Sequence, residues 1–340
     1  MKNLLLNKPF TLCVFFAFFL LPACKQSANQ QSADSAKEAT ATKINITVPQ
    51  TAYSIPTIIA IEKGFFKENG LDVRVNYVKT GKIAMDDLLA GKADFSNIVE
   101  TNVAFAGFNN ARITILCNFE KVYDGVIVAR RDKGITKPQD LKGKKLGIIL
   151  ATTSQVFADR FLEKHGIADA DITTINLLPP ALQSGIIEGS GVDAISLWQP
   201  FVYNVQKALG KNAITFADRQ VFTGYMNLAG KNEFIKNNPD AVANLLKGYQ
   251  KAEQFLATNK AESTGIIARV LNLNKTVVES IWDQYDFNLS MNKELLNATV
   301  TEGNWIIKTQ KGFEGKKLPD YTRFFDSAYL RKIDASKVNW

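Results

Sequence analysis

Three hydroxyl side chains, Thr152, Thr153 and Ser154, follow one another in the segment ILATTSQVFADRF (149–161). The apolar residues before them predict a strand, and the spacing of the apolar residues after them predicts a helix. One hydroxyl is expected to cap the helix, which leaves two for a ligand. The N–H groups at a helix start carry partial positive charge and can bind a carboxylate, sulfonate, nitrate or phosphate. The turn therefore predicts an anion site, with simple capping as the structural alternative.

Other polar and aromatic side chains stand at the ends of predicted strands. Trp198 and Gln199 come directly after the apolar strand AISL (194–197). In open α/β sheets, residues just beyond the carboxyl ends of the strands line the crevice where ligands bind. Trp198 can supply a flat apolar wall and Gln199 a donor and an acceptor, unless Trp198 packs internally. Further candidate ligand-binding residues on this basis are Tyr53, Glu100, Thr101, Asn102, Asn118 and Tyr225.

Glu100 points to a different ligand chemistry from the hydroxyl-rich turn. A carboxylate repels an anion but binds an amine or an amino-pyrimidine. Its structural alternative is an acidic residue at a helix start, where the helix dipole favours it. The charge of the ligand therefore stays open, and the aromatic pair Tyr53 and Trp198 favours a ligand with a flat or apolar part.

Nothing in the sequence predicts a catalytic residue, a metal site or a cofactor. His165 is the only histidine and lies at an expected helix end, and Cys117 lies in the apolar run ITILCNF as an expected buried strand residue. This excludes a Cys–His pair, a Ser–His–Asp triad and a histidine-based metal site. The chain also lacks a Gly-x-x-x-x-Gly-Lys-Ser/Thr phosphate loop. Metal binding or acid–base catalysis by carboxylates alone stays open, but we do not expect the protein to be an enzyme.

Strands and helices alternate from INITVPQ (44–50) to VDAISLW (192–198). This rhythm predicts an α/β fold of mostly parallel sheets covered by helices. LLAGKADFS (88–96) and IIEGSGVDAIS (186–196) share the order helix, glycine, Asp, strand, which indicates two similar lobes. After Lys231 the spacing predicts helices, whose apolar stripes carry Trp282 and Trp305 as core residues.

The N-terminal residues predict export and a lipid anchor. An apolar run too short to span a bilayer follows Lys2 and Lys8 and ends in Leu-Pro-Ala-Cys, which resembles a lipobox. We expect residues 1–23 to be a lipoprotein signal peptide and Cys24 to be lipidated and membrane-anchored. Residues 24–43, which lack large apolar side chains over most of their length, are expected to be a disordered tether.

Four segments carry a resemblance to a known family, the solute-binding proteins of bacterial ABC importers. They are IAIEKGFFKENGLDV (59–73), LPPALQSGIIEGSGVDAISLWQPF (178–201), ILATTSQVFADRF (149–161), where the resemblance implies a ligand at the hydroxyl-rich turn, and PDYTRFFDSAYLRKI (319–333). The branch handles nitrate, sulfonates, taurine and thiamine precursors. The resemblance implies a two-lobed periplasmic-binding-protein fold of type II, with lobe 1 formed by residues 44–125 and 224–340 and lobe 2 by 126–223. It also implies a ligand between the lobes, closure by a hinge, delivery to a membrane permease and a monomeric state.

Two alternatives to an importer remain on the same scaffold. Relatives in this fold family are enzymes that make a thiamine pyrimidine or a quinone precursor, although export argues against that chemistry. The other alternative is a sensory or partner-binding lipoprotein. Nucleic acid is not implied, because the net charge of +8 falls only to +6 without residues 1–23, which hold two lysines and no acid, and no block of like charges follows.

Overall fold

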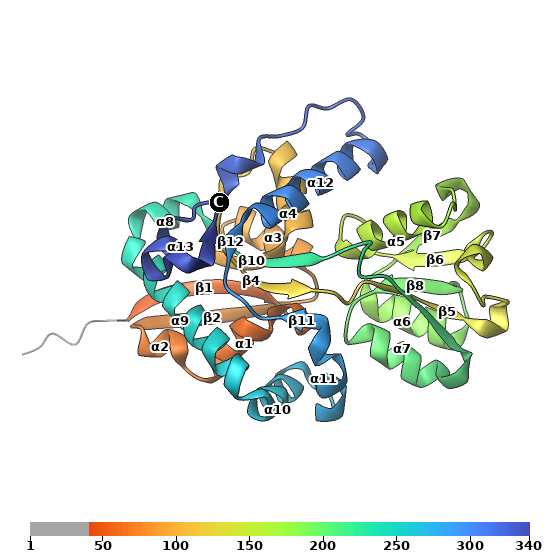
Figure 1. Cartoon of the computed structure of the whole chain (residues 1–340), viewed down its shortest axis with the longest axis horizontal. Coiled ribbons are helices and arrows are strands. Elements are labelled where there is room, and N and C mark those ends of the chain that lie inside the picture. The colour runs from red at the N-terminus through yellow and green to blue at the C-terminus, as the bar shows by residue number, and fades with distance from the viewer. Residues whose placement is uncertain (1–40) are drawn as a thin grey trace, which may run out of the picture. The chain divides into compact units, whose positions relative to one another are not determined.

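The structure is a computed structural model that describes residues 41–340. Its strands form two large sheets, each covered by helices (Figure 1). The six-stranded sheet has the order β11-β4-β10-β3-β1-β2, and the five-stranded sheet has the order β7-β6-β8-β5-β9. We call the first sheet with its helices lobe 1 and the second lobe 2. The predicted α/β class with two lobes is confirmed.

Lobe 1 takes its strands from both ends of the described chain. They are β1 (Thr42–Pro49), β2 (Leu71–Val78), β3 (Phe95–Val99), β4 (Ile113–Val122), β10 (Gly224–Lys231) and β11 (Tyr285–Asp286). The helices of this part are α1 (Ile55–Glu62), α2 (Phe65–Glu68), α3 (Gly81–Leu89), α4 (Glu100–Phe108), α8 (Asn232–Asn237), α9 (Pro239–Thr258), α10 (Lys260–Leu271), α11 (Lys275–Ile281), α12 (Lys293–Thr309) and α13 (Ala328–Ile333). A small separate sheet pairs β12 (Met291–Asn292) with β13 (Val338–Asn339).

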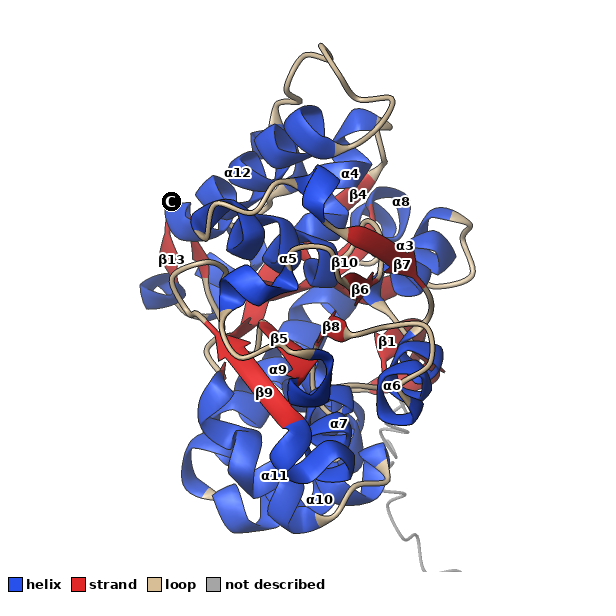
Figure 2. Ribbon diagram, turned by 90° about the vertical axis from the view of Figure 1, so that its right-hand side faces the viewer, coloured by secondary structure: helices blue, strands red, loops and turns tan. Residues whose placement is uncertain are grey.

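Lobe 2 is formed by one continuous stretch of chain. Its strands are β5 (Val126–Arg130), β6 (Lys145–Ile148), β7 (Thr173–Asn176), β8 (Ala194–Leu197) and β9 (Ala213–Ala217). The helices α5 (Thr153–Lys164), α6 (Pro179–Glu188) and α7 (Phe201–Leu209) lie around this sheet (Figure 2). The chain passes between the sheets twice, over residues 123–125 and 218–223.

Both sheets are mixed, and most strands of each run in one direction, as predicted: β1 to β4 in lobe 1 and β6 to β9 in lobe 2. β1 pairs in parallel with β2 and β3, and β6 with β7 and β8. β10, however, inserts between β3 and β4 and runs antiparallel to both, while β5 runs antiparallel to β8 and β9. The βαβ rhythm reports only on strands that follow one another, so it cannot show a strand that returns from the other lobe.

The core of lobe 1 contains the helical stripe that the sequence predicts in α9. Val242, Leu245, Leu246 and Tyr249 are fully buried. Tyr249 stacks on Phe119 of β4 with ring centroids 5.1 Å apart. Its hydroxyl shares a hydrogen bond of 2.8 Å with the Thr57 hydroxyl and accepts one of 3.0 Å from Asn97 Nδ2. A polar bridge thus joins α1, β3 and α9 inside an apolar core.

Tyr249→Phe is expected to lower the free energy of unfolding by about 1 kcal/mol, because a buried Asn97 N–H group loses its acceptor. Urea unfolding measures the change. Tyr203→Phe, on the half-buried face of α7, is the matched control and should change stability much less. Equal effects of the two substitutions would contradict this account of the core.

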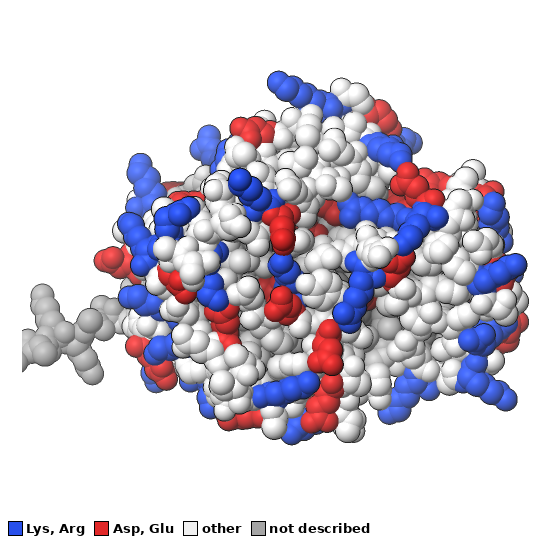
Figure 3. Space-filling view, viewed as in Figure 1, with Lys and Arg blue, Asp and Glu red and all other residues white. Residues whose placement is uncertain are grey.

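Several smaller predictions have a clear outcome. Trp282 and Trp305 are buried, and Cys117 is buried within β4, as expected. The signal peptide 1–23, Cys24 and the tether up to residue 40 lie outside the described residues, and β1 begins at Thr42, two residues before the expected start. Among residues 41–340, no helix has both the length and the apolar character needed to cross a membrane. Basic and acidic side chains are interspersed over the face shown in Figure 3.

Candidate functional site

A small cavity of about 30 Å³, partly open to solvent, lies between the two lobes. Strand ends from both sheets meet there, which is the crevice position expected for open α/β sheets. This volume is well below that of ordinary ligand pockets, which is about 300–1,000 Å³. Lobe 1 contributes Pro49, Thr51, Tyr53, Lys79, Thr80, Gly81, Lys82, Val99, Asn102 and Met226, and lobe 2 contributes Thr152, Thr153 and Trp198.

Two helices, one from each lobe, begin at this cavity. Thr80 caps α3, since its hydroxyl accepts a hydrogen bond of 3.2 Å from the Ile83 N–H. Thr152 caps α5 in the same way, accepting from the Ser154 N–H at 3.3 Å. Each cap and the first helical residue after it, Gly81 or Thr153, line the cavity. First-turn N–H groups have no partner within their helix, so both lobes present partial positive charge to the same space.

The predicted hydroxyl cluster places fewer free hydroxyls at the cavity than expected. Thr152 caps α5 and also donates to the Ile149 carbonyl at 2.7 Å. Ser154 is buried outside this cavity, where it donates to the Ser196 carbonyl at 2.5 Å and accepts from the Ile149 N–H at 3.0 Å. The hydroxyl of Ser154 therefore links α5 to β8 by a hydrogen bond. Of the three hydroxyls, Thr153 is the one that lines the cavity without a capping role.

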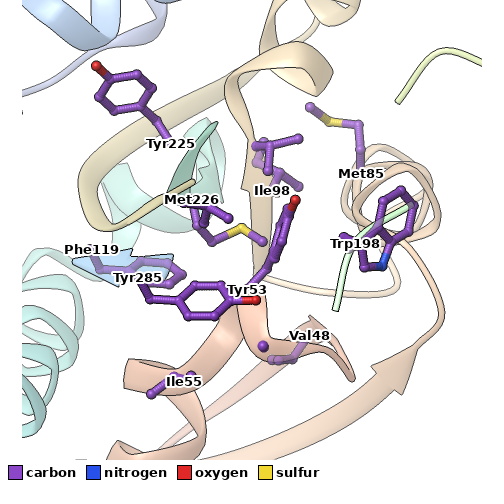
Figure 4. Close-up of a cluster of buried hydrophobic side chains, with 14 of the residues drawn as sticks. Val48, Tyr53, Ile55, Met85, Ile98, Phe119, Trp198, Tyr225, Met226 and Tyr285 are labelled. Carbon is purple, nitrogen blue, oxygen red and sulfur yellow. The ribbon is translucent and has the colours of Figure 1, made fainter. Parts of the chain in front are cut away.

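Aromatic and apolar side chains form the walls. The Tyr53 and Trp198 rings have centroids 6.2 Å apart, tilted by 47°. Met226 lies beside Tyr53 in Figure 4, and it lines the cavity together with Val99 and Pro49. Burial, followed by the charge of Asp124, raises the pKa of Tyr53 well above its ordinary value, so the Tyr53 hydroxyl stays protonated. The structure thus places Tyr53 and Trp198 together, in the flat apolar wall that the sequence predicts.

Two lysines that the sequence reasoning missed stand at the cavity. Lys79 is exposed, and Lys82 forms an exposed ion pair of 2.8 Å with Asp86. Both flank the start of α3, directly after strand β2. The strand-end rule that located Thr152 applies equally to LDVRVNYV (71–78), so the signal was present in the sequence. Lys79 adds positive charge beside the start of α3, whereas the charge of Lys82 is paired with Asp86.

Asn102 and Gly81 approach each other closely beside the cavity. Asn102 Oδ1 accepts a hydrogen bond of 3.3 Å from the Val99 N–H, and within residues 41–340 its Nδ2 group makes no hydrogen bond. A Cβ atom on Gly81 would lie 2.8 Å from that Oδ1 atom. A larger residue at position 81 would therefore force the Asn102 side chain to shift. The site residue Asn102 lines the cavity as the sequence predicts.

Glu100 and Thr101 lie away from the cavity. Glu100 is fully buried, and its Oε2 atom accepts a hydrogen bond of 2.6 Å from the Tyr225 N–H. Burial first and the charge of Glu302 second raise the pKa of Glu100 well above its ordinary value. Thr101 donates to Glu302 at 3.3 Å. The expected amine site at Glu100 is therefore corrected, because this carboxyl group faces the interior of lobe 1.

Asn118, Gln199 and Tyr225 also have structural roles. Asn118 donates to the carbonyls of Glu120 and Met226, at 3.0 and 2.8 Å. The Gln199 side chain accepts from the Tyr203 N–H at 3.1 Å. The Tyr225 ring lies under the Lys121 ammonium group, 5.5 Å from it. None of the three lines the cavity, although Gln199 directly follows Trp198, which does.

Three side-chain contacts join α5 of lobe 2 to α12 of lobe 1. Trp305 Nε1 donates to Asp159 at 3.0 Å, Arg160 and Glu302 approach to 3.0 Å, and Lys308 pairs with Glu163 at 2.7 Å. Burial raises the pKa of Asp159 to about 7, against the lowering effect of the Trp305 hydrogen bond. Burial likewise raises the pKa of Glu302, against the lowering effect of Arg160. The helix that begins at the cavity thus also contacts lobe 1 farther along its length.

Taken together, the cavity combines donors and positive charge with an apolar wall. Two helix starts, the Thr153 hydroxyl, Asn102 Nδ2 and Lys79 are all suited to an oxyanion. No carboxylate lines the cavity, and within the described residues 41–340 no cluster of three histidine, cysteine or acidic side chains could hold a metal ion. The arrangement of these groups is suited to binding an anion.

Comparison with solved structures identifies the class of the fold. The periplasmic aliphatic sulphonate binding protein SsuA of Escherichia coli aligns with a TM-score of 0.70 and 17% identity over 83% of this chain and 97% of that one. The nitrate-binding protein NrtA of Synechocystis aligns with a TM-score of 0.68 and 15% identity over 87% and 89%. The fold is therefore that of the two-lobed periplasmic binding proteins.

Sequence comparison gives the family. Residues 51–263 match the model described as NMT1/THI5 like, and the chain belongs to this family. A Bacillus subtilis protein provisionally named an aliphatic sulfonates-binding protein is 28% identical over 94% of this chain and 91% of its own length. A 4-amino-5-hydroxymethyl-2-methylpyrimidine phosphate synthase of Saccharomyces cerevisiae is 23% identical over 85% and 87%.

Proposed function

We propose that this protein binds a small anion between its lobes and delivers it to the membrane permease of an ABC importer. The observation that carries the proposal is the meeting of two helix starts, α3 from lobe 1 and α5 from lobe 2, at one cavity. An anion bound there contacts both lobes at once, so binding and closure favour each other. Lys79 strengthens the attraction.

The ligand class that fits best is a sulfonate-like or nitrate-like oxyanion. The apolar wall of Tyr53, Trp198 and Met226 favours an anion with an apolar part over a bare ion. Relatives named for aliphatic sulfonates support this choice. A thiamine-precursor-like amine is disfavoured, because Glu100 is buried away from the cavity.

Movement of the lobes would use the two chain crossings as a hinge. We assign residues 44–125 and 224–340 to lobe 1 and residues 126–223 to lobe 2, with the crossings at 123–125 and 218–223. Closure then creates the surface that the permease recognises, so that occupancy of the cavity controls delivery. A lipid on Cys24, after removal of residues 1–23, would hold the monomeric protein at the outer face of the membrane.

A thermal-shift screen of the purified full chain tests the proposal. The panel holds nitrate, ethanesulfonate, taurine, MOPS, thiamine and sodium chloride as an ionic-strength control. A ligand at 100 times its dissociation constant adds about 2.7 kcal/mol of stability and raises the melting temperature. We expect ethanesulfonate or MOPS to give the largest shift and to be recovered unchanged.

Two other results would redirect the assignment. A shift with thiamine alone would overturn the anion site. Conversion of a bound pyrimidine into product would favour an enzyme, as the yeast synthase relative suggests. Absence of any shift across the panel would leave the sensory lipoprotein as the better reading.

A further inference from the structure

A buried carboxylate lies at the first crossing between the lobes. Asp124, between β4 and β5, is 2% exposed. Its Oδ1 atom accepts a hydrogen bond of 2.6 Å from the Tyr53 hydroxyl. Its Oδ2 atom accepts one of 3.0 Å from the Tyr285 hydroxyl and one of 3.1 Å from the Gln199 backbone N–H. Three donors therefore converge on one side chain that is absent from the cavity lining.

The three donors come from both lobes. Tyr53 belongs to a short 3-10 turn (Ala52–Ser54) after β1, and Tyr285 belongs to β11, so both are in lobe 1. Gln199 follows β8 in lobe 2. Tyr53 lines the cavity, and so does Trp198, the residue directly before Gln199. Asp124 thus bonds to the side chain of Tyr53 in one cavity wall and to the backbone next to Trp198 in the other.

We propose that Asp124 is a positioning residue that couples closure of the lobes to assembly of the cavity walls. The bond to Gln199 joins the lobes, and the bond to Tyr53 sets the direction of the phenol ring. Closing the lobes makes the Gln199 bond and brings Trp198 against Tyr53 in the same step. The effect on affinity rests on the proposed anion binding, whereas the effect on the Gln199 contact does not.

The chemistry of the contact explains why a carboxylate is needed. An ionised carboxylate only accepts hydrogen bonds and has room for several donors. Burial raises the pKa of Asp124 to about 6, against the lowering effect of its three donors, so the group is ionised at neutral pH. Asparagine has the same shape but turns an NH₂ group toward one of the donors. One donor then loses its acceptor, which is the costly outcome for a buried group.

The test uses Asp124→Asn in the full chain with ethanesulfonate as probe. Calorimetry is expected to show at least about ten-fold weaker binding, the equivalent of about 1.4 kcal/mol. Hydrogen exchange at the Gln199 amide is expected to become faster, with or without the probe. Tyr285→Phe is the matched control, because it removes one bond to the same carboxylate without touching the cavity lining. It should change affinity by less than about three-fold.

A double-mutant cycle separates positioning from general stability. If Asp124 acts through Tyr53, the double variant Asp124→Asn/Tyr53→Phe loses less affinity than the sum of the two single losses. Three results would each overturn the inference. They are additive losses of affinity in the cycle, equal effects of Asp124→Asn and Tyr285→Phe on affinity, and unchanged hydrogen exchange at the Gln199 amide. If Asp124→Asn does not fold, exchange in the native protein decides: the probe must slow exchange at Gln199. Should the native protein bind no anion, the proposed function fails, and the exchange rate of the variant alone decides the role of Asp124.

Discussion

Thr153→Asp is expected to lower the affinity for ethanesulfonate by about a hundred-fold, close to abolishing binding. The new carboxylate would stand in the first turn of α5 inside the cavity lining, next to the bound anion. Two like charges about 4 Å apart repel by on the order of 4 kcal/mol at an effective dielectric constant near 20. A hundred-fold loss corresponds to about 2.7 kcal/mol, which is within that limit. Calorimetric titration measures the change.

An acidic residue in a first helical turn favours the helix, but Thr153 is only 6% exposed, so circular dichroism checks the fold of the variant before titration. The matched control is Thr276→Asp, which adds the same charge to the first turn of α11, at an exposed position outside the cavity. We expect the control to bind ethanesulfonate like the native protein. If both variants lose affinity equally, the effect comes from net charge and the α5 site is wrong.

The second large effect is an increase in stability on mild acidification. Burial raises the pKa of Asp159 to about 7, whereas the ordinary value is 3.8. A group whose pKa is raised by folding contributes stability below its ordinary pKa, and that contribution is lost as the pH rises through the folded value. The free energy of unfolding should therefore be higher at pH 5.5 than at pH 7.5, by on the order of 2 kcal/mol for this group. Urea unfolding at the two pH values measures the difference.

Other carboxyls either add to this trend or lie outside its window. Burial raises the pKa of Glu302, Glu100 and Glu120, which acts in the same direction. Asp140 and Asp320 have lowered pKa values, from hydrogen bonds to Thr136 and Thr322, and act only below about pH 4. Asp159→Asn should remove the contribution of this group and leave that of the other buried carboxyls, among them Asp124 with a pKa of about 6, so that the dependence between pH 5.5 and 7.5 becomes less steep. Stability that falls on acidification over this range would contradict the argument.

The sequence was most informative about local pattern. Alternation and helical spacing predicted the strands of both lobes, the α9 stripe around Tyr249 and the burial of Trp282 and Trp305. The strand-end rule also brought Tyr53, Asn102, Thr152, Thr153 and Trp198 to one cavity. These features depend on residues near one another in the chain, so the spacing of apolar residues and the capping residues predict them.

The remaining site features depend on contacts that no local pattern encodes. Ser154 and Glu100 stand at strand ends like the true lining residues, but tertiary contacts with Ser196 and Tyr225 occupy them. Asp124 is contacted by Tyr285 and by Gln199, which lie 161 and 75 residues away from it in the chain. Lys79 and Lys82 differ, since the same rule applied to strand 71–78 would have found them.

The difference between a continuous and an interrupted lobe has a consequence for synthesis. Every strand pair of lobe 2 lies within residues 126–217, so that lobe can assemble as soon as this stretch has emerged. Lobe 1 stays incomplete until β10 is available to insert between β3 and β4. Until then the facing edges of β3 and β4 lack their partner, and unpaired strand edges promote association between chains. A chain that stalls before residue 224 thus has a finished second lobe and a first lobe prone to aggregate.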